Sequence, residues 1–206
     1  MASLAKTNLN RSILELMEQN NEYIEEISTR EDFIDFLNIE TTRFLVKLAP
    51  SINEKIADDI SKYFHLLNDI ERIGDHAKNI LDESKEMRNK NIKFSQEAID
   101  EFKKTYEIID KLFNLSIKAF DNNTQKDIED HSLLLEQFKT MEKEYVQKHF
   151  ERLKIGKCSM ELGSFYTSVF AHFNSISSHL ENIISSFQIT QEMMANKSFD
   201  NKKGYV

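Results

Sequence analysis

The chain has 206 residues, 40% of them hydrophobic, and a formal net charge of −8. This length can bury a substantial core in one or two domains, and the acidic balance, with no basic stripe, argues against nucleic acid as the main partner. Only four glycines and one proline occur, so we expect an almost wholly helical protein. A single cysteine, Cys158, excludes an internal disulfide and is typical of a reducing compartment.

The sequence also bears on the location of the protein. There is no run of about 18 or more apolar residues, so no transmembrane segment is expected. The N-terminus, MASLAKTNLNR, lacks the apolar core of a signal peptide. We therefore expect a cytoplasmic protein, associated with the inner face of the membrane only peripherally. Whether the chain is free-standing or the soluble part of a longer transporter is left open.

Apolar spacing and capping residues predict six helices. In chain order they span residues 4–27, 28–48, 51–87, 95–120, 125–153 and 159–188. Capping boxes at 28–31 and 51–54 are taken as the starts of the second and third helices, and Ser95 and Ser159 as N-caps of the fourth and sixth. Residues 121–124 form a predicted turn. Phe44 and Tyr63 are expected to face inward.

Three helices, a loop and three further helices indicate an internal repeat. The pattern I-x-x-H-x-x-N-I occurs at residues 73–80 and again at 176–183. We therefore predict an all-α fold of two repeated antiparallel three-helix bundles. The predicted divisions are a first repeat at 1–90, a second repeat at 91–190 and a polar tail at 191–206. His76 and His179 share one repeat position, and we expect them to pack or form hydrogen bonds rather than bind a metal.

The stretch at 67–82, LNDIERIGDHAKNILD, departs most from ordinary amphipathic helix. Glu71 and Asp75 lie one turn apart, where like charges repel by roughly 0.2–0.5 kcal/mol unless something offsets them. Either a bound hard cation or Arg72 would do so. Gly74 costs about 1 kcal/mol relative to alanine inside a helix, which predicts close approach of a second helix at this position.

In the second repeat the acidic residues are lost while the apolar pattern is kept. The corresponding residues are Asn174 for Glu71, Ser175 for Arg72, Ser178 for Asp75 and Lys139 for Asp35. Charges that change while the fold-bearing positions remain are expected to serve something other than folding.

The string D-I-E-R-I-G-D-H-A-x-N-I at 69–80 resembles the signature of PhoU domains, and the resemblance extends over residues 9–187. A second string, which includes His149, Arg152 and G-K-C-S-x-E-L-G at 156–163, looks like the PhoU-like domains at the cytoplasmic end of sodium/phosphate cotransporters. The resemblance implies a pair of three-helix bundles and a role in controlling phosphate uptake or phosphate signalling. We expect His149 and Arg152 themselves to be structural.

PhoU-like proteins can hold iron, zinc or other ions on Glu/Asp-x-x-x-Asp motifs. The resemblance therefore implies that Glu71 and Asp75 are metal ligands, with Glu31 and Asp35 on the preceding helix as the opposing half, and at most one complete site. Carboxylate oxygens favour magnesium, manganese, calcium or iron, and zinc stays open. The rival interpretations are a solvated acidic face and, for Glu31 and Asp35, acids favoured near a helix N-terminus.

We do not expect an enzyme. Carboxylate-bridged di-iron oxidases need Glu-x-x-His on two helices, and none of the six histidines has glutamate three residues earlier. No nucleophile lies in a known motif, and no glycine-rich phosphate loop occurs. The expected partner is a phosphate transporter, its membrane domain or a sensor kinase, and a homodimer is left open. The alternatives are a metal-free helical adaptor or the soluble domain of a sodium/phosphate cotransporter.

Overall fold

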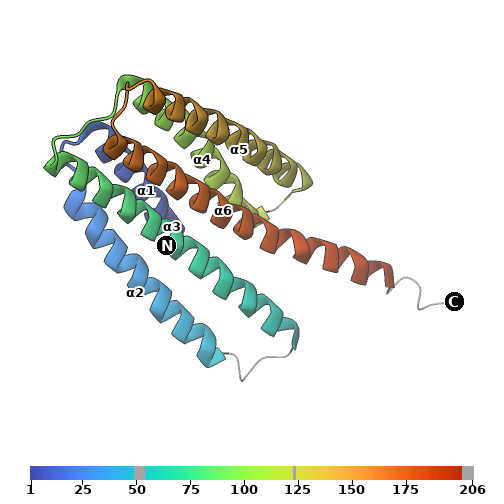
Figure 1. Cartoon of the computed structure of the whole chain (residues 1–206). Coiled ribbons are helices and arrows are strands. Elements are labelled where there is room, and N and C mark those ends of the chain that lie inside the picture. The colour runs from blue at the N-terminus through green and yellow to red at the C-terminus, as the bar shows by residue number, and fades with distance from the viewer. Residues whose placement is uncertain (49–53, 123, 201–206) are drawn as a thin grey trace.

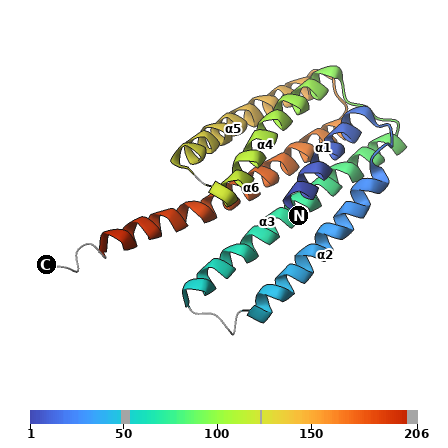
Figure 2. The same cartoon turned by 180° about the vertical axis from the view of Figure 1, so that it is seen from behind.

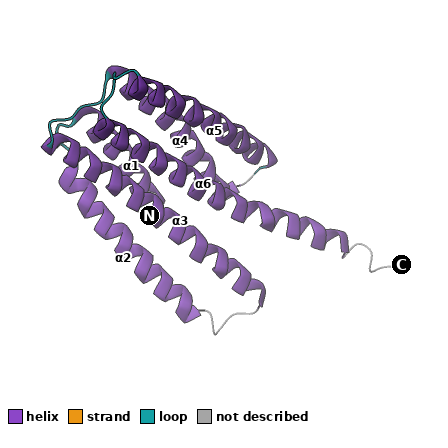
Figure 3. Ribbon diagram, in the orientation of Figure 1, coloured by secondary structure: helices purple, strands orange, loops and turns teal. Residues whose placement is uncertain are grey.

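The computed structural model describes residues 1–48, 54–122 and 124–200, with side chains for 1–48, 60–119 and 124–186. Within these ranges every regular element is a helix (Figure 3). The helices are α1 (Ala2–Glu18), α2 (Ile24–Leu48), α3 (Glu54–Asn89), α4 (Gln96–Asn122), α5 (Gln125–Lys154) and α6 (Met160–Asp200). In the described part of the chain, none of them is both long and apolar enough to cross a membrane.

The helices form two antiparallel three-helix units that lie side by side (Figures 1 and 2). Helices α1, α2 and α3 make the first unit, and α4, α5 and α6 make the second. The equivalent helices α3 and α6 pack against each other along the seam between the units, and α1 contacts α4. This arrangement confirms the predicted all-α fold.

One hydrophobic core runs through both units. Buried side chains of the first unit, such as Ile13 and Ile73, belong to the same cluster as Phe102 and Phe170 of the second. The rings of Phe102 and Phe170 are 5.6 Å apart between centroids. Burying a side chain of this size contributes about 1.5–3 kcal/mol. Because the core is continuous across the seam, the predicted division near residue 90 separates repeats and not independent cores.

The first predicted helix boundary is wrong. Helices α1 and α2 are separated by residues 19–23, whereas the pattern placed the break at 27/28. Gln19 and Asn21 have left-handed backbones, with φ of 54° and 68°. The carboxylate of fully buried Glu15 accepts hydrogen bonds from the backbone N–H of Asn21 (3.1 Å) and of Tyr23 (2.8 Å). A side chain from within α1 thus supports the turn into α2.

The capping box proposed at 28–31 lies inside α2 and caps nothing. The hydroxyl of Ser28 donates to the carbonyl of Ile24 at 3.0 Å, a bond to the preceding turn. Glu31, its proposed partner, points instead toward α3, as described below. The second proposed box spans 51–54, and residues 51–53 lie outside the part of the chain that the structure describes.

Other predicted helix ends are confirmed. The hydroxyl of Ser95 accepts the N–H of Ala98 at 3.3 Å, and that of Ser159 accepts the N–H of Leu162 at 3.1 Å. Helix α6 runs to Asp200, beyond the predicted end, and takes in part of the predicted tail. No glycine or proline precedes residue 204 in this segment, so nothing in its sequence stops the helix.

The α2–α3 hairpin extends past the N-terminus of α1 (Figures 1 and 2). Phe44 and Tyr63, predicted to face inward, are 59% and 41% exposed there. The reason is that α1 begins only beside the middle of α3, where Met1 lines a groove with Leu66. Phe36, on the outer side of α2, is also exposed.

A buried polar network holds the turn into α6. Arg152 donates to both carboxylate oxygens of Glu101, at 2.9 and 2.8 Å, and the hydroxyl of Tyr166 donates to the same carboxylate at 2.6 Å. The His149 ring stacks on Tyr166 with centroids 4.1 Å apart. A Cβ on Gly163 would lie 3.0 Å from His149 Nε2, so only glycine fits without displacement. These contacts agree with the structural role predicted for His149 and Arg152.

Candidate metal centre

Gly74 lets α2 approach α3 closely. A Cβ built on Gly74 would lie 3.2 Å from Glu31 Oε2 and 3.4 Å from Ile34 Cδ1, both on α2. The first of these distances is tighter than ordinary van der Waals contact. The close approach predicted at Gly74 is therefore confirmed, and the group that occupies the space is the Glu31 carboxylate.

Three carboxylates meet where these helices approach. One oxygen each of Glu31, Asp35 and Asp75 lies within 4.8 Å of the other two. We call these three residues the carboxylate cluster. Glu31 and Asp35 are one turn apart on α2, and Asp75 faces them from α3. Glu31 is 1% exposed, Asp75 is half-buried and Asp35 is exposed. The cluster thus has a buried floor and an edge open to solvent, through which a small ion can enter.

The charge on Glu31 has no compensating hydrogen bond. Neither of its oxygens meets a donor among the described residues. Burial is the main cause that raises the pKa of Glu31 to about 7, and the nearby charges of Asp75 and Asp35 add to it. An unpaired buried carboxylate is costly. Either a proton shared with Asp75 or a bound cation would relieve that cost.

Glu71 and Arg72 occupy different positions from the cluster. Glu71 is half-buried one turn before Asp75, and its carboxylate does not belong to the group of three oxygens. Burial raises the pKa of Glu71, as does Asp75, while Arg72 lowers it. The Arg72 side chain is 64% exposed, and its Nε is 3.9 Å from Glu71 Oε2. Arg72 thus faces Glu71 and solvent, away from the buried carboxylate of Glu31.

Comparison with known proteins finds a family model that matches the first repeat. Residues 1–84 match the family model described as the PhoU domain. We use PhoU domain as the label for the region of the first repeat that matches this model. All four predicted ligands, Glu31, Asp35, Glu71 and Asp75, lie within it.

Two relatives extend the likeness beyond the PhoU domain. Over 200 residues the chain is 26% identical to the phosphate-specific transport system accessory protein PhoU homolog 1 of Thermotoga maritima. The match covers 88% of this chain and 83% of that protein. The crystal structure of PhoU from Pseudomonas aeruginosa matches with a TM-score of 0.81 at 14% identity, over 91% of this chain and 90% of that one. The second likeness establishes the shared fold across both repeats.

The donor set in the PhoU domain suits a hard cation. Three carboxylates and no cysteine are what magnesium, calcium, manganese and iron favour. The unpaired, buried oxygens of Glu31 are the strongest indication that a cation binds here. Asp35 and Asp75 would complete the protein ligands, and Glu71 is close enough along α3 to act on the cluster through its charge.

The second repeat carries no equivalent of this cluster among its described residues. Lys139, which corresponds to Asp35, lies 3.8 Å from the carboxylate of Glu181. Ser178, which corresponds to Asp75, donates to the carbonyl of Asn174 at 3.0 Å. Both positions are satisfied by neighbours in their own repeat, so the carboxylates belong to the PhoU domain alone.

The repeated histidines lie on the other side of α3, at the seam with α6. His76 Nδ1 is 3.0 Å from Nδ1 of His172, and His179 Nδ1 is 2.9 Å from Asp69 Oδ1. Burial and the nearby rings of His172 and His179 lower the pKa of His76 to about 4, so its ring is neutral. The expected hydrogen bonding of His76 and His179 is confirmed. His172, which sequence reasoning did not single out, completes the group.

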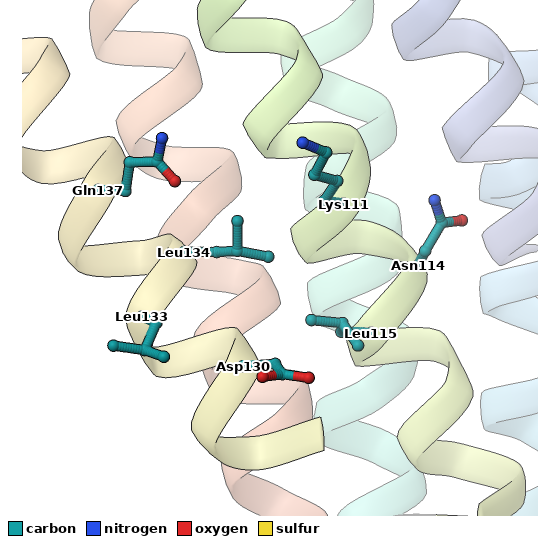
Figure 4. Close-up of a pocket in the computed structure, with 7 residues that line it drawn as sticks. All are labelled: Lys111, Asn114, Leu115, Asp130, Leu133, Leu134 and Gln137. Atoms are coloured by element: carbon teal, nitrogen blue, oxygen red, sulfur yellow. The ribbon is translucent and has the colours of Figure 1, made fainter. Parts of the chain in front are cut away.

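A separate groove of about 520 Å³ is lined by residues of α4 and α5 (Figure 4). Leu115 and Leu134 line it from the two helices, and Lys111 and Asp130 stand at its edge. It holds single charges of both signs and none of the clustered carboxylates. We assign no chemistry to it.

Proposed function

We propose that this protein regulates phosphate uptake or phosphate signalling by binding a transporter or sensor partner at the cytoplasmic face of the membrane. We further propose that it holds one metal ion in the carboxylate cluster. The match to the PhoU domain and the name of the Thermotoga maritima relative, an accessory protein of a phosphate-specific transport system, support the first part. The second part rests on Glu31, buried with unpaired oxygens beside Asp35 and Asp75.

The ion would join α2 to α3. Two of its ligands, Glu31 and Asp35, come from α2, and Asp75 comes from α3. When bound, the ion supplies positive charge between like-charged groups. Without it, those carboxylates repel one another and Glu31 is stabilised by a proton instead. Occupancy would therefore set how tightly α2 is held against the rest of the PhoU domain. Bare carboxylates are poor ligands for phosphate unless a metal bridges them, so we expect no direct phosphate binding by these side chains.

The outer face of α2 is the surface on which we expect the transporter to bind. Large apolar side chains that are exposed together on one element can mark an interaction site. Phe33 and Phe36 stack with centroids 6.1 Å apart and are about half exposed. Ile39, Phe44 and Val46 continue the apolar surface along the helix. Because α2 carries both metal ligands and this surface, an ion that fixes α2 would also fix the surface.

Metal content is the first test. The chain is purified without chelator or nickel resin and measured by mass spectrometry, beside Glu31→Gln/Asp75→Asn and the control Asp32→Asn/Asp82→Asn. The control removes two exposed carboxylates from the same two helices, so both double variants change the net charge equally. We expect near-stoichiometric metal in the parent and control and its loss in the cluster variant, with helicity kept.

The opposite outcome has a definite meaning. If no metal is retained after incubation with iron, zinc, manganese and magnesium, the cluster is not a metal site. The protein would then be a metal-free helical adaptor, and a proton alone would relieve the buried charge of Glu31.

Phosphate uptake tests the regulatory part. Uptake of labelled phosphate is followed in source cells that lack the chain, complemented with the parent, the cluster variant or Phe36→Ser/Phe44→Ser. We expect the parent to restore normal uptake and both variants to fail, while protein levels stay equal. Uptake that is the same with and without the chain would contradict a role in phosphate control.

The string at 149–163 favours a second candidate, the soluble part of a sodium/phosphate cotransporter. In this candidate the partner is a membrane domain of the same polypeptide. An immunoblot of the source cells separates the two. A species near 24.2 kDa agrees with a free-standing regulator, whereas one larger species confined to membranes agrees with a cotransporter.

A further inference from the structure

Three histidines meet at the seam between the repeats. His76 comes from α3 of the PhoU domain, and His172 and His179 come from α6 of the second repeat. The ring centroids of His172 and His179 are 5.2 and 5.8 Å from that of His76. All three side chains are partly buried. We call them the histidine cluster, and none of them belongs to the carboxylate cluster.

Hydrogen bonds fix the protonation of His179. Its Nδ1 is 2.9 Å from Asp69 Oδ1, and Asn182 donates to the same oxygen at 3.3 Å. An ionised carboxylate only accepts hydrogen bonds. The neutral ring of His179 therefore carries its proton on Nδ1 and its lone pair on Nε2.

A longer chain of bonds fixes the protonation of His76. Nε2 of His172 is 3.2 Å from Glu83 Oε1, a carboxylate that also accepts the hydroxyl of Ser168. His172 thus holds its proton on Nε2, and its Nδ1 accepts from Nδ1 of His76 at 3.0 Å. This leaves a lone pair on Nε2 of His76. Among the described residues, no hydrogen bond reaches Nε2 of either His76 or His179.

This is the pattern of metal-binding histidines. Such histidines donate the N–H of the other ring nitrogen to a carboxylate, which fixes the tautomer and raises the basicity of the ligand. Asp69 does this directly for His179, and Glu83 does it through His172 for His76. Two imidazoles on one ion, with metal–nitrogen bonds of about 2.0–2.1 Å, hold their centroids roughly 5 Å apart at a tetrahedral angle and roughly 6 Å apart at wider angles. The rings of His76 and His179 are 5.8 Å apart.

We propose that His76 and His179 bind a borderline transition-metal ion such as zinc through their Nε2 atoms, with water in the remaining positions. The site differs in chemistry from the carboxylate cluster, because imidazole nitrogen suits zinc, nickel and copper whereas carboxylate oxygen suits harder ions. One ligand comes from each repeat. The ion therefore ties the PhoU domain to the second repeat, whereas an ion in the carboxylate cluster ties α2 to α3.

The tautomers are tested directly on the unmodified protein. In nitrogen-detected NMR of chain labelled with ¹⁵N-histidine, we expect His76 and His179 to show protonated Nδ1 and bare Nε2. Added zinc should then shift the Nε2 signals of these two residues. Protonated Nε2 in either residue, or Nε2 signals unmoved by zinc, would overturn the proposal.

Affinity provides the second test. Zinc is titrated against a competing dye in the Glu31→Gln/Asp75→Asn background, which removes the carboxylate cluster. Adding His76→Gln or His179→Gln should weaken binding by more than about tenfold, and Asp69→Asn, which removes only the supporting carboxylate, by about tenfold. The control is His65→Gln, an exposed histidine on α3 outside the cluster. Equal affinity in control and cluster variants would show that the histidines only hydrogen-bond across the seam.

Discussion

Replacing Glu31 with glutamine should stabilise the metal-free protein, and the gain should grow with pH. The pKa of Glu31 is raised from its ordinary value of 4.5 to about 7. Between these values the folded state holds a proton that the unfolded state has released, so each pH unit lowers the free energy of unfolding by about 1.4 kcal/mol. The penalty is absent below pH 4.5, builds up to about 3 kcal/mol by pH 7 and is constant above it. Glutamine resembles the protonated acid and carries no such penalty.

Urea denaturation followed by circular dichroism, in the presence of EDTA, measures this difference. The free energies of unfolding of the parent and Glu31→Gln should nearly coincide at about pH 4.5 and differ by up to about 3 kcal/mol at about pH 8. Glu40→Gln, which removes an exposed carboxylate from the same helix, is the matched control. A variant that is less stable than the parent at about pH 8, or a difference independent of pH, would refute the reasoning, because it would mean that the carboxylate is compensated without a cation.

Added metal should close most of this difference in stability. An ion that binds only the folded parent stabilises it by about 2.7 kcal/mol at a hundred times its Kd, which nearly offsets the penalty on Glu31. The variant lacks this ligand and should gain little. A parent that gains no stability from manganese, iron or magnesium would contradict this expectation.

Three further substitutions have defined outcomes. Gly74→Ala puts a methyl group 3.2 Å from Glu31 Oε2, so calorimetry should show weaker metal binding. The free energy of unfolding should change by less than about 1 kcal/mol, because alanine favours the helix. Unchanged metal binding would mean that the Glu31 carboxylate moves freely. Arg152→Met leaves the buried charge of Glu101 without its ion-pair partner and should cost about 3–5 kcal/mol in urea denaturation. A cost near zero would mean that water replaces the arginine. Glu15→Ala removes the acceptor of two backbone N–H groups at the α1–α2 turn; it should cost about 2 kcal/mol and speed hydrogen exchange at that turn, and unchanged exchange would contradict the capping role.

Local sequence signals were enough for most of the fold. The scarcity of glycine and proline predicts helices, and Ser95 and Ser159 cap through bonds to residues three positions on. The prediction of the α1–α2 boundary was wrong because the turn depends on the buried carboxylate of Glu15, a contact that no capping rule includes. The pattern at 28–31 looked like a box, but Glu31 is used in a tertiary contact with Gly74.

The candidate sites were predictable only within single helices. Spacing puts Glu71 and Asp75 on one side of α3, but which of them faces Glu31 depends on how α2 crosses α3 at Gly74. The pairing of the two helices came from family resemblance and not from spacing. The contact between His76 and His172 joins residues far apart in the sequence, and His172 has no counterpart in the repeated pattern, so only packing of α3 on α6 reveals it.

The most direct test of the carboxylate cluster is anomalous diffraction from crystals grown with manganese or iron, collected at the absorption edge of the metal. We expect one strong peak in the PhoU domain, bonded to carboxylate oxygens of Glu31, Asp35 and Asp75, and none at the matching position of the second repeat beside Lys139 and Ser178. Fully loaded crystals with no peak at these three side chains, or with Glu31 still unpaired and the ion elsewhere, would contradict the metal centre.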